Sequence, residues 1–542
     1  MESTMMHGQL TLAPLLERAG RYRAGIEIVS RMGDGKLHRY TYADFYRRAR
    51  ALAEALTRAG LRRHDRVATL MWNHHVHLEA YFGIPLARGV LHTLNLRLFP
   101  SEIAWIARHA EDRFLIVDDV LLPLLDQFKN EASFERIFVV STGEKPVPAG
   151  YEDYEQFLKT ATGDFVPPQI EETEPLGMCY TSGTTGRPRG VVYSHRSTVV
   201  HAYNGVMPDH WAFTMLGAMC PVVPMFHANA WGLPYGAVMV GMKQVYPGPH
   251  PTAESLLDLF AAENVTVSGG VPTVWLEVLR LLEQNPGRWR LAPGLRLMIG
   301  GSAAPEPLIR AFDRHGITVV HAYGLTETSP MTHLCGLKPY MKDLGEDQRY
   351  AYRAKQGLAT PLVEQRVMAE GKEVPADGKT MGELQLRGPI ITGSYYKLPS
   401  DPDKFTSDGW FCTGDIVSVD AEGYIKITDR TKDLIKSGGE WISSVDLENA
   451  IMGHPAVAEA AVIAMPHPKW DERPLAVVVL KPGAKATKEE LRSFLEGKFA
   501  KWWLPDDYVF ADSIPRTSTG KFLKSKLREM YAQPAAGAKA AG

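Results

Sequence analysis

Apolar and polar residues alternate with two different periods along the chain. Residues 41–60 have helical spacing, because Phe45, Leu52 and Leu56 recur on one face. A Thr41-x-x-Asp44 pair resembles a capping box before this run, and Gly60 ends it. The run VATLMW at 67–72 follows and is typical of a buried strand. The pattern therefore predicts a helix that leads directly into a strand.

Three later apolar runs end in small residues. They are MCYTSG at 178–183, VTVSGG at 265–270 and LRLMIGGS at 295–302. Short apolar runs bounded by glycine predict buried strands of an α/β architecture. Ligands usually bind beyond the carboxyl ends of such strands, so we expect a site at these small residues.

The alternation changes near residue 382. The segments GELQLRG and IVSVDAEGYIKITDR alternate apolar and polar residues, and DAEG at 420–423 predicts a hairpin turn. We therefore expect antiparallel strands here. Charged and polar residues at 429–433 have few bulky neighbours, and we place a domain boundary and a hinge there.

A compact α+β unit is predicted after this boundary. Its strands are expected at 457–465 and 474–480. A capping box, Thr487-x-x-Glu490, starts a predicted helix, whose apolar face we expect to carry Leu491, Phe494, Leu495 and Phe499.

Composition narrows the class of protein. The chain has 542 residues, of which 45% are apolar, and its 60 basic and 62 acidic residues nearly balance. This balance argues against a dedicated nucleic-acid binder. The N-terminus does not predict a secretory signal, and no apolar run predicts a membrane span. We expect a cytoplasmic protein, with a disordered tail over 531–542.

Cysteine and histidine spacing gives little support to a metal centre. The four cysteines are Cys179, Cys220, Cys335 and Cys412, which lie far apart and form no C-x-x-C pair. We therefore expect neither a zinc site nor a disulfide framework. The run NHHVH at 73–77 has only Glu79 nearby at a familiar ligand spacing. We favour a structural role for these histidines.

The segment YTSGTTGRPRG at 180–190 is suited to binding phosphate. Its glycines let backbone N–H groups converge on an anion, and its hydroxyl groups add donors. The hydroxyl of Thr184 can also complete a magnesium shell. The segment differs from the P-loop pattern G-x-x-x-x-G-K-[ST], and a flexible loop without a ligand is the alternative.

Four further segments supply side chains that suit a nucleotide. In HAYGLTET at 321–328, Tyr323 can stack on a base, Thr326 can contact phosphate and Glu327 can hold magnesium. Small residues in GGSAAP at 300–305 let a flat ring approach the backbone. Asp415 can pair with ribose hydroxyls, and Lys521 can neutralise charge on a phosphate. Taken alone, HAYGLTET is more often an ordinary turn and Lys521 more often a solvated loop lysine, while GGSAAP is as typical of tight strand-to-helix packing.

The order and spacing of these segments resemble the adenylate-forming superfamily over roughly residues 10–530. The chain looks closest to medium- and long-chain fatty acyl-CoA synthetases, on VVPMFHANAWGLPY at 222–235, GVPTVW at 270–275 and KSGGEWISSVDLEN at 436–449. The resemblance implies a large N-terminal domain over 1–430, made of α/β subdomains and a distorted antiparallel β-barrel. It implies a small mobile α+β domain over 431–530.

The resemblance also implies two half-reactions. A carboxylate attacks the α-phosphate of ATP to give an acyl-adenylate and pyrophosphate, and the thiol of coenzyme A then displaces AMP. The implied cofactors are ATP, Mg²⁺ and coenzyme A as co-substrate. The implied partner is a fatty acid, with no nucleic acid and no transmembrane segment. Relatives suggest a homodimer, and contact with a membrane surface stays open.

The residues that the resemblance assigns fall into five groups. The phosphate loop is Thr181, Ser182, Gly183, Thr184, Thr185 and Gly186, with Thr184 and Glu327 on magnesium. The nucleotide pocket is Gly301, His321, Ala322, Tyr323, Thr326, Asp415 and Arg430, and Lys432 is at the hinge. Lys436 and Trp441 are expected near the nucleotide, and Gly438 and Gly439 along the path of coenzyme A. The acyl group is expected beside His227, Ala228 and the gating Trp231. Lys521 is expected to bridge the carboxylate and the α-phosphate.

Two residues depart from the family pattern, and three other readings stay open. Arg189 stands where lysine is usual, and His321 where glutamine or asparagine is frequent. The alternatives are another adenylating branch (an aryl-CoA ligase or a luciferase-like enzyme), a domain that charges a carrier protein, and a nucleotide-binding protein without catalysis. The sequence does not fix the preferred acyl chain length.

Overall fold

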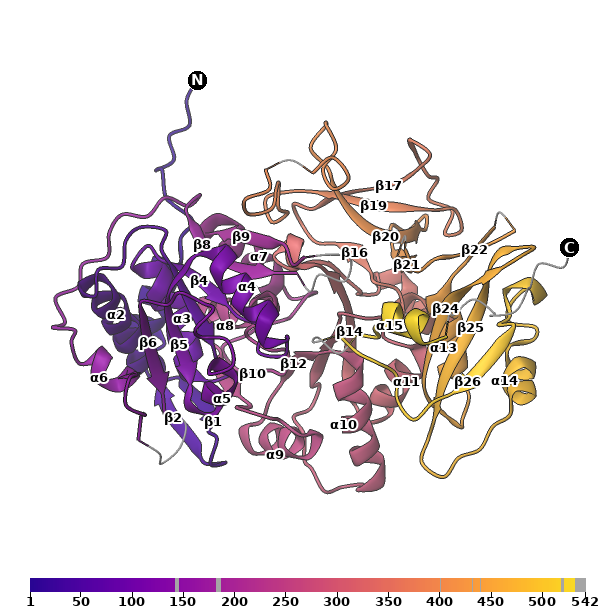
Figure 1. Ribbon diagram of the computed structural model, residues 1–542, viewed down its shortest axis with the longest axis horizontal. Coiled ribbons are helices and arrows are strands. Elements are labelled where there is room, and N and C mark those ends of the chain that lie inside the picture. Colours follow the sequence, from indigo (N-terminus) through magenta and orange to yellow (C-terminus); the bar gives the residue numbers. More distant parts are fainter. Residues whose placement is uncertain are drawn as a thin grey trace, which may run out of the picture.

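The computed structural model describes residues 1–141, 146–181, 187–399, 401–430, 432–438, 440–517 and 521–531. Two large sheets form the body of the protein, a smaller antiparallel sheet lies above them, and a C-terminal unit lies to one side (Figure 1). No helix in these ranges is long and apolar enough to span a membrane.

The first large sheet has seven strands in the order β7-β6-β5-β3-β4-β8-β9. All neighbours are parallel except β8 and β9. The strands are β3 (Arg66–Leu70), β4 (Val90–Thr93), β5 (Asp112–Asp118), β6 (Arg136–Val140), β7 (Glu152–Asp153), β8 (Pro175–Tyr180) and β9 (Gly190–Ser194). The antiparallel pair β8–β9 places the ends of the predicted phosphate loop next to each other.

The second large sheet has nine strands in the order β16-β15-β14-β13-β12-β10-β11-β1-β2. It is parallel from β14 to β1 and antiparallel at both edges. The strands are β1 (Glu27–Arg31), β2 (Leu37–Thr41), β10 (Ala218–Pro221), β11 (Lys243–Tyr246), β12 (Val267–Gly270), β13 (Arg296–Ile299), β14 (Thr318–Gly324), β15 (Met331–Leu334) and β16 (Leu358–Ala359). The expected strands at 265–270 and 295–302 are therefore confirmed as neighbours.

Helices lie between the two large sheets and on their outer faces. The inner layer is α1 (Leu12–Tyr22), α2 (Tyr42–Arg58), α3 (His75–Leu86), α7 (His195–Val206) and α8 (Leu233–Val240). The outer helices are α4 (Pro100–Ala110), α5 (Leu122–Leu125), α6 (Tyr154–Leu158), α9 (Ala253–Glu263), α10 (Pro272–Gln284), α11 (Glu306–Arg314) and α12 (Glu346–Arg353). Every residue of α3 is buried, because it contacts a strand of each sheet. One apolar core therefore joins both sheets.

The helix predicted over 41–60 is confirmed as α2. The Thr41 hydroxyl accepts from the backbone N–H of Asp44, whose carboxylate accepts from the N–H of Thr41, so two orphan donors of the first turn are satisfied. The NHHVH histidines lie in the core at the start of α3. His74 contacts Asp118 at 2.8 Å, and His77 contacts Thr69 at 3.0 Å.

The antiparallel strands predicted after residue 382 are confirmed. A third sheet has the order β18-β17-β19-β20-β21, formed by β17 (Glu364–Ala369), β18 (Lys372–Glu373), β19 (Met381–Arg387), β20 (Phe411–Val419) and β21 (Ile425–Arg430). The turn at 420–423 closes the β20–β21 hairpin, and Gly423 takes a φ of +85° there, which a side chain would disfavour.

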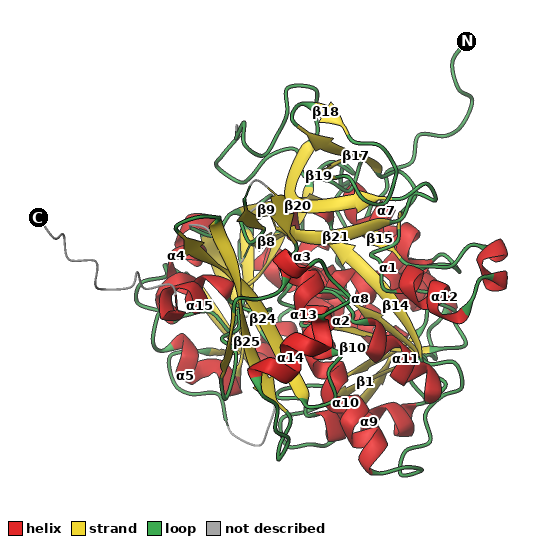
Figure 2. Ribbon diagram, turned by 90° about the vertical axis from the view of Figure 1, so that its right-hand side faces the viewer, coloured by secondary structure: helices red, strands yellow, loops and turns green. Residues whose placement is uncertain are grey.

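The C-terminal unit is α+β, as predicted (Figure 2). Its strands are β22 (Ile435–Ser437), β23 (Glu440–Ile442), β24 (Val457–His467), β25 (Asp471–Leu480) and β26 (Asp507–Phe510), and its helices are α13 (Ser444–Met452), α14 (Lys488–Leu495) and α15 (Lys524–Tyr531). The capping box at Thr487 is confirmed. Placing Phe499 on that helix was wrong: the helix ends at Leu495, Gly497 has a φ of +81°, and Phe499 stacks on Trp503 instead.

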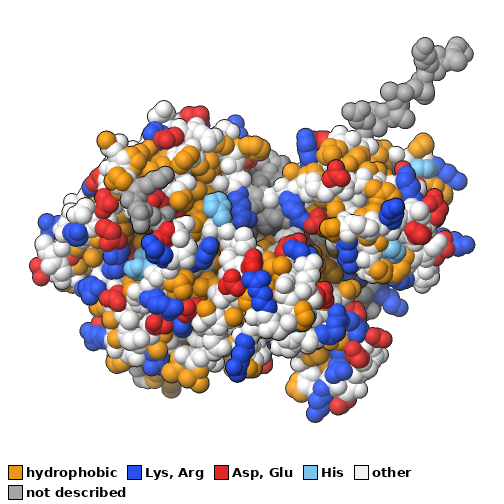
Figure 3. All heavy atoms as spheres, turned by 90° about the horizontal axis from the view of Figure 1, so that it is seen from below, with side chains coloured by type: hydrophobic (Ala, Val, Ile, Leu, Met, Phe, Trp, Pro, Cys, Tyr) orange, Lys and Arg blue, Asp and Glu red, His pale blue; other side chains and the backbone are white. Residues whose placement is uncertain are grey.

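Acidic and basic side chains are interspersed over the face shown in Figure 3, without one large area of a single sign. This distribution agrees with the nearly balanced composition.

Candidate active site

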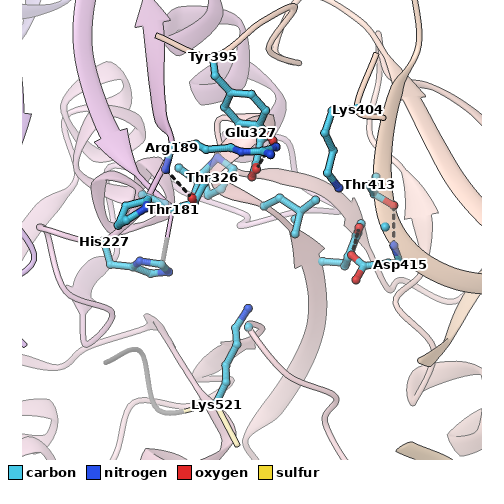
Figure 4. A pocket seen from close by; sticks show the side chains of 18 of the residues that line it. Thr181, Arg189, His227, Thr326, Glu327, Tyr395, Lys404, Thr413, Asp415 and Lys521 are labelled. Atoms are coloured by element: carbon cyan, nitrogen blue, oxygen red, sulfur yellow. Dashed lines mark hydrogen bonds between the residues drawn. The ribbon is translucent and has the colours of Figure 1, made fainter. Parts of the chain in front are cut away.

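A cavity of about 670 Å³ lies where the ends of several strands converge. It is lined by the predicted residues Thr181, His227, Ala228, Trp231, Gly301, Ala322, Tyr323, Thr326, Glu327, Asp415, Arg430, Lys432 and Lys521. In Figure 4, Lys521 points into the cavity from the side opposite Arg189, Glu327 and Tyr395, with His227 and Asp415 at its flanks. The fold thus brings together residues from both large sheets, the third sheet and the C-terminal unit.

A hydrogen-bonded carboxylate forms one wall. Asp415 lies on β20 and is 5% exposed. Its Oδ2 accepts from the hydroxyl of Tyr323 at 2.6 Å, and its Oδ1 lies 3.4 Å from Nε of Arg430. The Asp415 charge, opposed by burial, raises the pKa of Arg430, and burial raises that of Tyr323 well above its usual value. Tyr323 and Arg430 therefore keep their own protons and hold the side chain of Asp415 in place.

Glu327 forms the opposite wall together with side chains from three other segments. The Tyr395 hydroxyl donates to Oε1 of Glu327 at 2.8 Å. The Arg189 guanidinium lies 5.0 Å from the centre of the Tyr395 ring and pairs with Asp401 at 2.8 Å. The backbone N–H of Arg189 also donates to the Thr181 hydroxyl at 3.1 Å. Arginine thus makes a stacked and paired contact that a lysine would not reproduce.

Lys521 is half-buried and lines the cavity, although it belongs to the C-terminal unit. Its Cε lies 3.7 Å from the position that a Cβ would take on Gly301. A backbone hydrogen bond fixes the position of Lys521, because the Thr517 N–H donates to the Lys521 carbonyl at 2.7 Å. Burial, followed by the charge of Arg430, lowers the pKa of Lys521 to about 8, while Asp415 and Glu327 oppose the shift. A bound anion would therefore stabilise the charged form of Lys521 and raise its pKa again.

The apolar end of the cavity is formed by a turn with unusual backbone geometry. Residues Ala228 to Trp231 all have φ between +43° and +57°, a left-handed conformation that is uncommon for side-chain-bearing residues. The Trp231 ring fits beside two glycines: it lies 3.4 Å from a Cβ built on Gly300 and 3.5 Å from one built on Gly269. His227 precedes this turn, and burial and Lys521 lower its pKa to about 4, so its ring is neutral.

Several predicted residues lie elsewhere. His321 belongs to β14, which continues through residue 324. Its Nε2 accepts from Ala304 N at 3.2 Å and its Nδ1 contacts the Ala354 carbonyl at 3.0 Å, so the side chain is engaged away from the cavity. Lys436 and Trp441 do not line it either; they face each other across β22 and β23, with a cation–π separation of 6.0 Å.

Coenzyme A was expected along Gly438 and Gly439. The N–H of Gly438 donates to the Trp470 carbonyl at 2.9 Å, outside the cavity. Gly439 lies outside the described residues, as do Ser182, Gly183, Thr184, Thr185 and Gly186.

Several cavity residues have no counterpart in the predicted site, among them His109, Tyr395, Lys404 and Thr413. His109 comes from α4, and its Nδ1 lies 2.7 Å from the Tyr180 hydroxyl. Thr413 accepts from the backbone N–H of Asp415 at 3.1 Å. Thr413 could have been found from the sequence, because it lies only two residues from Asp415. Nothing in the sequence linked His109, Tyr395 or Lys404 to the site.

The cavity also suits a divalent cation beside phosphate. Glu327 contributes a carboxylate to a cavity that Thr181, Thr326 and Thr413 also line, and hard cations such as Mg²⁺ prefer oxygen ligands. Within the described ranges no cluster of three or more His, Cys, Asp or Glu could bind a metal without such additional oxygens. The oxygen ligands of this cavity therefore fit a Mg²⁺ ion whose remaining ligands come from the phosphate groups of a nucleotide.

Known proteins resemble this chain over nearly its whole length. The AMP-binding enzyme model matches residues 16–396, and the model of the AMP-binding enzyme C-terminal domain matches 446–521. A long-chain-fatty-acid–CoA ligase of Thermus thermophilus is 52% identical over 98% of this chain and 97% of its own. A medium-chain-fatty-acid–CoA ligase of Ectopseudomonas oleovorans is 41% identical over 98% of each.

Among solved structures, ATP-bound MatB from Rhodopseudomonas palustris is 26% identical, with a TM-score of 0.80 over 96% of this chain and 99% of its own. The cavity, the strand-end segments that line it and both family models agree. The chain belongs to the family of AMP-binding enzymes.

Proposed function

We propose that this protein is an ATP-dependent, AMP-forming ligase that activates a medium- or long-chain fatty acid and transfers the acyl group to coenzyme A. One observation carries the proposal: the cavity joins an ammonium, two carboxylates and an apolar end at Trp231. Two full-length relatives named as fatty-acid–CoA ligases support the substrate class.

In the first half-reaction a fatty-acid carboxylate oxygen attacks the α-phosphorus of ATP. The new P–O bond forms as the bond to the β-phosphate oxygen breaks, and pyrophosphate leaves with that electron pair. Such chemistry needs positioning and charge neutralisation more than a protein nucleophile. Lys521 supplies the positive charge between carboxylate and α-phosphate, Asp415 and Arg430 hold the ribose, Gly301, Ala322 and Tyr323 flank the adenine, and Thr326 contacts the phosphate.

The bound Mg²⁺ would be held by Glu327 and by the Thr184 hydroxyl, and it would neutralise phosphate charge. Tyr395 orients the carboxylate for this role by its hydrogen bond at 2.8 Å. Arg189 backs Tyr395 and approaches the phosphate end in place of the usual lysine.

In the second half-reaction the thiol sulfur of coenzyme A attacks the acyl carbonyl, the C–O bond to the phosphate breaks, and AMP leaves. Lys521 occupies the side of the cavity opposite Glu327, and coenzyme A must reach the same acyl carbonyl that Lys521 serves in the first half-reaction. We therefore propose that a small domain over 431–530 turns about Lys432 against a large domain over 1–430. This motion withdraws Lys521 and brings in the face with Lys436, Gly438, Gly439 and Trp441.

We further propose that the enzyme works as a homodimer in the cytoplasm.

Lys521→Ala tests the assigned reaction. We expect the rate of pyrophosphate release with ATP and fatty acid to fall by at least about a hundredfold, because the charge at the α-phosphate is lost. Thioester formation from supplied acyl-adenylate and coenzyme A should stay within about twofold of the parent rate. Equal loss in both half-reactions would refute two separate catalytic arrangements.

The substrate class is tested by a chain-length series from acetate to palmitate, followed as coenzyme A thioester. We expect kcat/KM to peak between medium and long chains, since each buried methylene group adds binding energy. A maximum at acetate, or faster turnover of benzoate, would overturn the fatty-acid assignment.

A further inference from the structure

A buried chain of polar contacts runs from the segment that carries Lys521 to the end of β21. The Lys524 ammonium lies 2.7 Å from Oε1 of Glu448 and also donates to the Ser444 hydroxyl. Ser444 in turn donates to Oδ2 of Asp429 through both its hydroxyl and its backbone N–H, the latter at 2.8 Å. We call these four residues, Asp429, Ser444, Glu448 and Lys524, the boundary network.

The boundary network is almost inaccessible to water. Asp429 is 2% exposed, Ser444 is 0% exposed and Glu448 is 6% exposed. Although burial alone lowers the pKa of Lys524, the carboxylates of Glu448 and Asp429 raise it overall. A buried charge destabilises a protein unless its partners are in place. An arrangement of the two domains that separates the network residues is therefore less stable than the observed one.

The boundary network joins the two sides of the proposed hinge. Asp429 precedes Lys432 and is the penultimate residue of β21, whereas Ser444, Glu448 and Lys524 follow Lys432 on α13 and α15. Asp429 satisfies the first N–H of α13, where a negative charge is also favoured by the helix dipole. A rotation about residue 432 would carry α13 away from Asp429 and break this contact.

Each end of the boundary network is close in sequence to a residue that lines the cavity. Asp429 is followed by Arg430, which contacts Asp415 at 3.4 Å. Lys524 lies three residues after Lys521, and between them the N–H of Leu523 donates to the Pro515 carbonyl at 2.8 Å. None of the four network residues lines the 670 Å³ cavity itself. We therefore expect them to affect its chemistry by placing the groups that line it.

We propose that Asp429 and Lys524 are positioning residues, which lock the small domain onto the large one in the arrangement that holds Lys521 in the cavity. This inference rests on the role of Lys521 in the proposed function. The lock favours the first half-reaction and must open for the second.

A matched control is available on the same two elements. Lys426 on β21 and Asp446 on α13 also pair across the boundary, at 2.8 Å. The Lys426 side chain is 45% exposed, and exposed pairs contribute little. Lys426→Met therefore removes a boundary contact without opening the buried network.

The test compares Asp429→Asn, Lys524→Met, Lys426→Met and the double variant Lys524→Met/Glu448→Gln. Acyl-adenylate formation is measured in a single turnover, thioester formation is measured from supplied acyl-adenylate, and melting temperature reports folding. The double variant removes the buried Lys524–Glu448 pair together, and the Asp429 carboxylate still accepts from the hydroxyl and the N–H of Ser444. The glutamine keeps an acceptor for the N–H of Val462, which now donates to Glu448 at 2.8 Å. The double variant should therefore melt closer to the parent temperature than Lys524→Met does.

We expect Asp429→Asn, Lys524→Met and the double variant to form acyl-adenylate at least about tenfold more slowly, with thioester formation unchanged or faster. Lys426→Met should match the parent in both. The inference is overturned if the double variant regains adenylation together with its stability, if both half-reactions slow equally, or if adenylation is unaffected. Lys521→Ala is run beside them: if it is slow and Asp429→Asn is not, only the inference fails, whereas an active Lys521→Ala removes the proposed function as well.

Discussion

The ammonium of Lys521 is the charge on which the chemistry at the α-phosphate depends. Its surroundings contain cations as well as anions, because Arg430 and Lys432 line the same cavity as Asp415 and Glu327. Burial and Arg430 therefore lower its pKa to about 8 before substrate binds. His227 beside it stays neutral at physiological pH, since its pKa is lowered to about 4. Of Lys521 and His227, only Lys521 thus changes its charge near physiological pH.

This pKa predicts how the first half-reaction depends on pH. Lys521 acts as a cation, so kcat/KM for pyrophosphate release should fall as pH rises through about 8 rather than near 10.5, the usual lysine value. The measurement is a pH profile at subsaturating ATP. Lys521→Arg is the control, because arginine stays charged and its slower rate should not decline in this range. A parent profile that stays flat to pH 10 would contradict the prediction.

At the scale of elements, the strands end in residues that suit contact with a ligand. β12 and β13 end beside Gly269 and Gly300, and the Trp231 ring fits against both because neither has a side chain. The left-handed turn of Ala228 to Trp231 directs this ring into the cavity wall. The length of the apolar end is therefore set by one side chain on one strained turn.

Removing that ring should change chain-length preference. In Trp231→Ala the cavity is extended toward Leu233, so we expect the ratio of kcat/KM for palmitate over octanoate to rise about tenfold, a typical effect of reshaping an apolar pocket. Trp231→Phe should give an intermediate ratio. Thioester formation with each acid is the readout, and an unchanged ratio would show that Trp231 does not limit the acyl site.

At the scale of the whole molecule, the small C-terminal unit completes a site that is built mainly elsewhere. It supplies Lys521 to the cavity while its face with Lys436 and Trp441 stays outside. A second cavity of about 240 Å³ lies between it and the large body, lined by residues of both, including Gly301, Asp429, Glu448 and Lys524. Incomplete packing at this interface is consistent with two parts that separate during turnover.

A covalent bridge across the boundary tests this motion. The four native cysteines are buried, so Lys426→Cys/Asp446→Cys adds two accessible thiols to positions whose side chains now meet. Joining them with a short, reducible thiol reagent should leave acyl-adenylate formation within about twofold and slow steady-state thioester production at least about tenfold. Reduction should restore turnover, and each single variant serves as control. A bridged enzyme with full turnover would exclude the rotation.

Much of the fold could be predicted from local patterns. The capping boxes at Thr41 and Thr487 and the hairpin turn at 420–423 are confirmed, because each is decided by contacts within a few residues. The length of α14 was overestimated, since the apolar spacing continued past Gly497 while the backbone did not. The antiparallel edge strands β1 and β2 joined a sheet built mostly of strands after residue 218, which no local pattern indicated.

The sequence by itself determined which chemical groups are present: the hydroxyl-rich segment, the carboxylates of Glu327 and Asp415, and the lysine at 521. Only the tertiary structure decided which of them share a cavity. It placed Tyr395 on Glu327 and Arg189 on Tyr395, kept His321 within the strand layer, and linked Asp429 to Lys524. The physical reason is that periodicity and capping act over a few residues, whereas these contacts join residues from 15 to more than 200 positions apart.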